Sequence, residues 1–182
     1  IQLLLAESQL LRDGGRTQEA YELLAGGLAT QPEQSELLYE SALLAEKLGR
    51  HEAMEASPRK LIRLKPEHAH AYNALGYSFA ERNQRLEEAE QLVLKALQLS
   101  PDDPFIIDSM GWVLYRKGDN QGALAHLQRA FSIRPDPEIA AHLGEVLWAL
   151  GRRDEAKRIW QEAAKAHPGN EVLAEVIKRF AP

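Results

Sequence analysis

Apolar and polar residues alternate along the chain with the spacing of amphipathic helices. The stretch MGWVLYRKGDNQGALAHLQRAFSIRP, residues 110–135, predicts two short helices that are joined by a Gly-Asp turn and closed by a proline. A single hairpin of this kind cannot bury its own apolar side, so we expect other hairpins to cover it. Trp112 and Tyr115 in its first helix lie off the apolar stripe, which makes them candidates for an exposed surface.

The same helical pattern returns every 33 to 35 residues along the chain, which indicates a repeat architecture. A proline closes each unit, a small residue stands at its eighth position, and a glycine or asparagine marks its internal turn. The prolines are Pro32, Pro66, Pro101, Pro135 and Pro168; the small residues are Ser8, Ala42, Gly76, Gly111 and Gly144; the turn residues are Gly15, Gly49, Asn83, Gly118 and Gly151. Small side chains let two antiparallel helices approach closely, and a proline cannot continue a helix, so each unit is predicted to be one hairpin.

These units resemble the tetratricopeptide repeat (TPR) family, whose spaced small, aromatic and proline positions occur in AYNALGYSFAERNQRLEEAEQLVLKALQLSP of the third unit. The resemblance implies an all-α fold, a right-handed α-solenoid of five TPR hairpins followed by a C-terminal capping helix. Within a single domain, 1–182, the predicted repeats are 1–34, 35–68, 69–103, 104–136 and 137–170, and the capping helix is 171–180. Because the chain opens directly in a helical pattern, we expect it to be a fragment of a longer array.

Two places depart from the regular pattern. Pro58 falls where the second helix of its unit should continue, and a proline inside a helix costs about 3 kcal/mol. We therefore predict a break or kink between Glu52 and Pro58, with Ser57 and Pro58 able to start a new helix. The first unit has no helix before it, so its uncovered edge is a candidate for self-association.

In TPR stacks the first helix of each hairpin lines a concave face, and the resemblance implies the same orientation here. Large aromatic residues on such a face supply contact area at low entropic cost. The candidate protein-binding residues are Tyr39, Leu43, Asn73, Tyr77, Asp108, Trp112, Tyr115, Arg116, Glu145 and Trp148. We expect this groove to bind an extended or helical polypeptide. Its expected anchors are Tyr77, Trp112, Tyr115 and Trp148, whereas Trp160 in a second helix is expected to belong to the core.

Composition narrows the functional classes. The 182 residues carry a formal net charge of −5, which disfavours a general nucleic-acid binder, and they include no cysteine. No run of residues is long and apolar enough to predict a membrane span. No phosphate-binding loop, catalytic elbow or zinc motif occurs, so we predict a non-catalytic protein without a cofactor or a metal. His142 and Glu145, three residues apart, are expected to be a surface pair.

A closer resemblance is carried by DSMGWVLYR, residues 108–116, and AAHLGEVLW, residues 140–148. Both segments are similar to the C-terminal repeats of proteobacterial TPR lipoproteins on the periplasmic side of the outer membrane. This family implies an adaptor that binds a periplasmic carboxy-terminal processing protease and its cell-wall hydrolase substrates. It also implies a periplasmic location, with the full-length protein anchored in the outer membrane. The alternatives left open are a cytosolic assembly scaffold and, more remotely, a repeat-type RNA binder.

Overall fold

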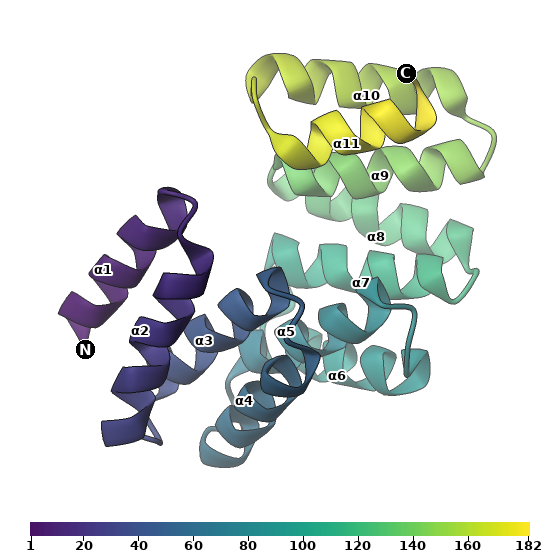
Figure 1. The fold of residues 1–182 in the computed structure, drawn as a ribbon. Coiled ribbons are helices and arrows are strands. Elements are labelled where there is room, and N and C mark those ends of the chain that lie inside the picture. Colours follow the sequence, from purple (N-terminus) through teal and green to yellow (C-terminus); the bar gives the residue numbers. More distant parts are fainter.

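The computed structural model describes residues 1–182 as eleven α-helices without any strand (Figure 1). Their bounds are α1 (Gln2–Asp13), α2 (Thr17–Thr30), α3 (Ser35–Lys47), α4 (His51–Leu64), α5 (Ala69–Glu81), α6 (Leu86–Leu99), α7 (Pro104–Arg116), α8 (Asn120–Ile133), α9 (Pro137–Ala149), α10 (Arg153–Ala166) and α11 (Glu171–Phe180). Helices α1 to α10 pair into antiparallel hairpins, which stack into a curved array that ends at α11. The predicted all-α solenoid is confirmed.

One kind of tight turn joins the two helices of every hairpin. Each turn contains a residue with a positive φ, at the position where the sequence places a glycine or asparagine. These angles are 76° at Gly15, 67° at Gly49, 53° at Asn83, 92° at Gly118 and 81° at Gly151. In the first turn, the Gly15 N–H donates to the carbonyl of Arg12 and the Arg16 N–H donates to that of Leu11. This Schellman arrangement satisfies the carbonyls at the helix end and needs a residue that tolerates the left-handed region.

Small residues on the first helix of a hairpin let the second helix come close. A Cβ atom added at Gly144 would lie 2.0 Å from Nε1 of Trp160, and one added at Gly76 would lie 2.7 Å from Cγ2 of Val93. Trp160 is fully buried, as predicted, and its Nε1 donates to the carbonyl of Ala141 at 3.3 Å. The paired helices can therefore approach closely only because glycine has no side chain at these positions.

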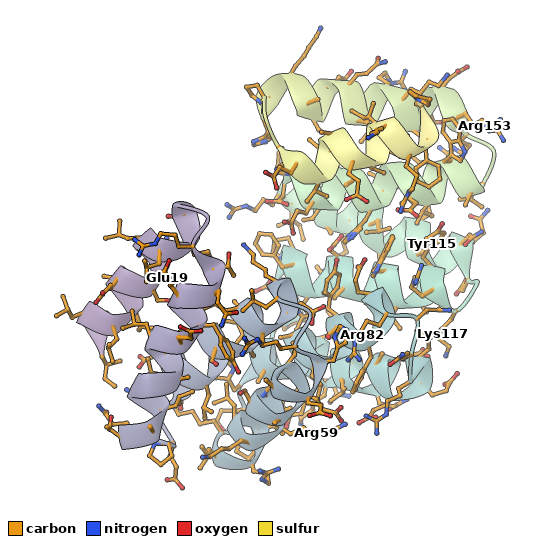
Figure 2. The ribbon with its side chains drawn as sticks, in the orientation of Figure 1. Glu19, Arg59, Arg82, Tyr115, Lys117 and Arg153 are labelled. Atoms are coloured by element: carbon orange, nitrogen blue, oxygen red, sulfur yellow. The ribbon has the colours of Figure 1, made fainter.

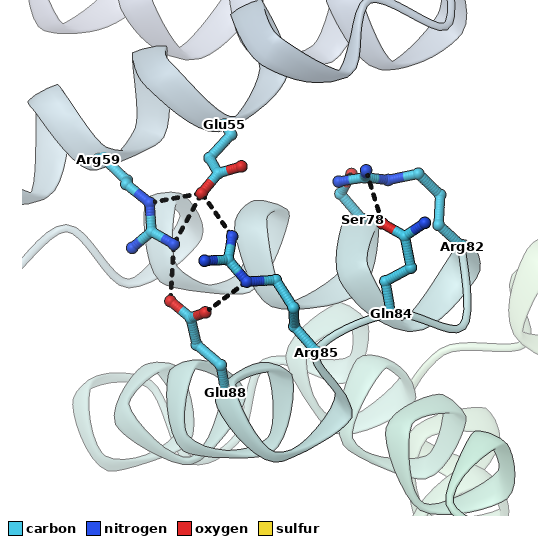
Figure 3. A network of polar contacts seen from close by, with 7 residues as sticks. All are labelled: Glu55, Arg59, Ser78, Arg82, Gln84, Arg85 and Glu88. Carbon is cyan, nitrogen blue, oxygen red and sulfur yellow. Dashed lines mark hydrogen bonds and ion pairs between the residues drawn. The ribbon is translucent and has the colours of Figure 1, made fainter.

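On the outer face, four charged residues tie the second hairpin to the third (Figure 3). Arg59 on α4 lies 2.9 Å from Glu55 and 2.7 Å from Glu88 on α6. Arg85 contacts the same two carboxylates at 2.7 and 3.3 Å. Because each charge has two opposite partners, the four form a closed network, which contributes more than isolated surface pairs do.

Of the predicted break or kink at Pro58, the break is wrong, and the kink stays a prediction. α4 is one continuous helix from His51 to Leu64, and Pro58 lies inside it with its ring buried. Proline has no N–H to donate to the carbonyl four residues earlier, that of Met54, so the helix lacks one hydrogen bond there. Met54 and Leu61 on the same helix are also buried. Packing of this apolar side holds the helix together across the missing bond.

The two ends of the array differ in their exposed apolar surface. Leu3 and Leu10 on α1 are 80% and 74% exposed, so the first helix presents an uncovered apolar face. At the other end, α11 buries Leu173 and Val176 against the last hairpin and exposes its charged residues. No helix in the array combines the length and the apolarity that a bilayer span requires.

Candidate functional site

Two hollows lie on the inner helices of the array. The N-terminal hollow, of about 590 Å³, is formed by α1, α3 and the link between α4 and α5. Its lining includes Leu5, Gln9, Arg12, Tyr39, Glu40 and His68. The C-terminal hollow, of about 520 Å³, is formed by α5, α7, α9 and α11. Its lining includes Tyr77, Trp112, Glu138, His142, Val172 and Arg179.

A chain of polar and aromatic contacts forms the floor of the C-terminal hollow. Nδ1 of His142 on α9 lies 2.9 Å from the carboxylate of Asp108 on α7, and Nε2 lies 3.3 Å from the hydroxyl of Tyr77 on α5. The imidazole stacks on the indole of Trp112, with ring centroids 4.1 Å apart. His142 and Asp108 are both buried away from water, so each side chain satisfies the hydrogen-bonding need of the other. Side chains thereby join the three inner helices.

Burial and nearby charge set the protonation of this floor. Burial alone lowers the pKa of His142, but the charge and the hydrogen bond of Asp108 outweigh it, so the pKa is raised. Because a carboxylate only accepts hydrogen bonds, the Nδ1–H of His142 is the donor in its contact with Asp108. Burial also raises the pKa of Tyr77 well above its usual value, so the phenol keeps its proton. The result is a fixed hydrogen-bonded chain from α5 to α9.

Arg179 fastens α11 to the inner surface. Its guanidinium lies 2.9 Å from the carboxylate of Glu145 on α9. The hydroxyl of Tyr115, which Figure 2 labels on α7, donates to the same carboxyl group at 3.5 Å. Burial raises the pKa of Glu145, and the charge of Arg179 offsets only part of this shift. α11 therefore forms one wall of the C-terminal hollow.

Trp112 and Trp148 do not form the exposed aromatic wall that the sequence pattern predicts. Trp112 lies at the C-terminal hollow but is only 4% exposed, and His142 stacks on its ring. Trp148 lines neither hollow, because it packs on Trp160 and Phe180 with centroid distances of 5.9 and 5.8 Å. The prediction that Trp112 is an exposed anchor is wrong, because His142 covers its ring. Trp148 is half-buried, and its packing on Trp160 and Phe180 places it outside both hollows.

The other predicted residues divide among several environments. Those that line the C-terminal hollow, besides Trp112, are Tyr77, Arg116 and Glu145. Tyr39 lines the N-terminal hollow, and Asp108 is buried in the floor of the C-terminal hollow. Leu43 and Asn73 are half-buried and line neither hollow, although Oδ1 of Asn73 is buried without a hydrogen-bond partner. The structure thus brings together only part of the predicted set.

Several residues of the C-terminal hollow are missing from the predicted set. His142 is not a surface neighbour of Glu145, as the spacing suggests, because its ring is buried against Asp108. The other residues missed are Glu81, Glu138, Ala141, Val172, Glu175, Val176 and Arg179. Glu81 and Glu138 lie on first helices, α5 and α9, which the resemblance already implies line the concave face, whereas the α11 residues depend on how that helix docks. No group of three His, Asp or Glu side chains is placed to hold a metal ion.

Comparison with known proteins bears on the family. Three family models, each described as tetratricopeptide repeat, match residues 35–68, 58–104 and 114–178. A TPR repeat-containing protein of Pseudomonas aeruginosa is 45% identical over 145 residues, which are 80% of this chain and 25% of that protein. The chain therefore spans about a quarter of the length of this curated relative.

Solved structures agree with the family models. A thermophilic TPR protein from Thermus thermophilus superimposes with a TM-score of 0.86 at 25% identity, over 99% of this chain and 96% of that one. PilF from Pseudomonas aeruginosa gives 0.71 at 18% identity, over 100% and 91%. MamA from Desulfovibrio magneticus gives 0.68 at 17% identity, over 93% and 96%. The last two show likeness of fold alone. By its repeats, its helical hairpins and these matches, the chain belongs to the tetratricopeptide repeat family.

Proposed function

We propose that the chain is a non-catalytic scaffold that holds a polypeptide segment against the inner surface of the solenoid, mainly in the C-terminal hollow. The observation that carries this proposal is the hollow itself. Four helices, α5, α7, α9 and α11, enclose about 520 Å³ and present apolar and charged side chains around a hydrogen-bonded floor. The family supports the coarser function, because a TPR stack is a protein-interaction fold.

The lining of this hollow suits a peptide. Tyr77 and Val172 offer apolar contact, while carboxylates and guanidinium groups around them offer hydrogen bonds. Protein interfaces combine these two kinds of contact in the same way. The floor is already fixed by the contact between His142 and Asp108, so a ligand need not order it on binding. A segment that enters with a few side chains would find a preformed site.

A bulky substitution at Val172 tests this proposal. Val172 is 39% exposed and lines the hollow from α11, so Val172→Trp fills the space without removing a buried side chain. We expect capture of partner proteins from a bacterial envelope extract to fall about tenfold, a loss of about 1.4 kcal/mol of binding free energy. The measurement is quantitative mass spectrometry of the captured proteins.

Leu94→Trp is the matched control for this experiment. Leu94 is 38% exposed and lies on α6, an outer helix, so the same bulk is added away from the hollow. Proteins that bind the wild type and Leu94→Trp equally, but are lost from Val172→Trp, support the proposal. Equal capture by both variants contradicts it.

We further propose that the full-length protein acts in the bacterial envelope, as an adaptor for a periplasmic carboxy-terminal processing protease. Support comes from the resemblance of residues 108–116 and 140–148 to TPR lipoproteins of the outer membrane. The similar protein of Pseudomonas aeruginosa is a longer bacterial TPR protein, which agrees with a bacterial origin of this role. Its name gives neither a location nor a partner. Cytosolic assembly is the competing role, and the net charge of −5 disfavours RNA binding.

Cell fractionation separates these roles. We expect the native full-length protein in the outer-membrane fraction, and we expect a carboxy-terminal processing protease to co-purify with it. Recovery in the cytoplasm without that protease would instead favour the assembly scaffold. Salt-sensitive retention on immobilised RNA would favour the RNA binder.

A further inference from the structure

The charges around the C-terminal hollow are not balanced. Three of its lining residues, Glu81, Glu138 and Glu175, are exposed and form no ion pair within the chain, and we call them the acidic rim. They come from α5, α9 and α11, so three different helices bring carboxylates to one space. Glu145 differs from them, because Arg179 neutralises it at 2.9 Å.

Arg116, the remaining cation of this hollow, directs its donors at the backbone. Its Nε donates to the carbonyl of Ala80 at 3.0 Å, and Nη2 donates to the backbone carbonyl of Glu81 at 3.4 Å. Lys47 on α3 lowers the pKa of Glu138 by its charge, but it neither lines the hollow nor contacts that carboxylate. The charge that His142 carries when protonated is matched by Asp108, 2.9 Å away. One guanidinium and one more distant ammonium therefore stand against the three carboxylates of the acidic rim, and an excess of negative charge remains.

The negative charges around the hollow help to raise the pKa values of two of its residues, Glu138 and His142. Partial desolvation and the charges of Asp136 and Asp108 raise the pKa of Glu138 in spite of the opposing charges of His142 and Lys47. For His142, burial lowers the pKa, but Asp108 and then Glu81 and Glu138 raise it. A positive charge placed at the rim would therefore be stabilised by groups that are already in position.

The N-terminal hollow does not share this imbalance. Arg12 on α1 lies 3.6 Å from Glu40 on α3, and Lys65 lines the same hollow as Glu36. Two cations thus match two carboxylates. Burial lowers the pKa of His68, which leaves that ring neutral near pH 7. The negative excess is a property of the C-terminal hollow and not of the whole inner surface.

We propose that the polypeptide segment bound in the C-terminal hollow carries an arginine or a lysine, whose cation is held by the acidic rim. This inference rests on the proposed function and adds the chemistry of the partner. The long aliphatic stem of either residue packs along apolar surface while its charged end stays among polar groups. Tyr77 and Val172 supply that surface beside the three carboxylates.

Selection from a random 12-residue peptide display library tests the inference. The bait is the wild-type chain, and clones that also bind Val172→Trp are removed, so the remaining clones depend on the hollow. We expect these clones to be enriched several-fold in arginine or lysine over the input library. Their synthetic peptides should bind about tenfold more weakly to a variant with Glu81→Gln, Glu138→Gln and Glu175→Gln, and this difference should shrink at high salt.

A second triple variant is the matched control. Glu22→Gln, Glu52→Gln and Glu162→Gln remove the same charge from exposed positions on α2, α4 and α10, the outer helices. Binding to this control should equal that of the wild type. Clones that depend on the hollow without basic enrichment, or equal loss in both triple variants, would overturn the inference and leave the proposed function standing. If no clone depends on Val172, the proposed function fails as well.

Discussion

The ring of His142 fixes the inner surface at the scale of single residues. It contacts Asp108 through Nδ1, Tyr77 through Nε2 and Trp112 by stacking. Because the imidazole covers the indole, Trp112 is part of the floor and not a free anchor. Alanine at Trp112 would therefore remove a buried side chain, and any loss of binding would be mixed with a loss of stability.

The contact between His142 and Asp108 predicts a pH dependence of stability. The pKa of His142 is raised above its ordinary value of 6.5, so the folded state binds this proton more tightly than the unfolded state. The stabilisation is fully present below about pH 6.5 and is lost as the pH rises through the folded-state pKa. Asp108→Asn should cost about 2 kcal/mol at pH 6 and less at pH 8, as measured by urea unfolding. The same loss at both pH values would contradict this account.

Gly144 is the residue at which the close approach of two helices can be tested. Gly144→Ala would place Cβ against the fully buried ring of Trp160, so we expect a loss of about 3 kcal/mol in the free energy of unfolding. Gly26→Ala is the matched control, because no atom lies within 4 Å of a Cβ there. That substitution in the interior of α2 should stabilise the chain by up to about 1 kcal/mol. Similar effects at both positions would refute the packing argument.

At the scale of elements, α4 shows how packing can outweigh a missing hydrogen bond. We expect Pro58→Ala to stabilise the chain by about 1 kcal/mol, because a proline inside a helix costs about 3 kcal/mol and the lost burial of its ring returns only part of that. Ala56→Pro, at an exposed position of the same helix, should destabilise by about 3 kcal/mol. Thermal and urea unfolding measure both variants, and a clear loss of stability in Pro58→Ala would mean that the ring packing dominates.

α11 explains why one repeat position has two different environments. Tyr115 and Trp148 both occupy the twelfth position of their units. The hydroxyl of Tyr115 reaches Glu145 in the following hairpin, whereas Trp148 is followed only by α11 and packs on Trp160 and Phe180. Position in the repeat alone therefore could not predict their exposure, because the next element decides it.

At the scale of the whole molecule, the fold was predictable because its determinants are local and repeated. Glycine or asparagine at each turn and small residues at each helix contact recur five times, and all five of these turn residues have a positive φ. The C-terminal hollow was predictable only in part. Tyr77 and Arg116 follow from their repeat positions, but the burial of Trp112 depends on His142, and one wall depends on the docking of α11. Side-chain contacts between repeats are not contained in the repeat pattern.

The central claim is that a polypeptide lies in the C-terminal hollow, and site-specific photo-crosslinking tests it most directly. A photo-reactive amino acid is placed at Val172 on the hollow and, in a second protein, at Leu94 on the outer face, where exposure is nearly equal. Crosslinked partner peptides are then identified by mass spectrometry after purification from cells. We predict that Val172 yields one defined partner segment and Leu94 yields none. Recovery of the same segment at equal yield from both positions, or from Leu94 alone, would contradict the account.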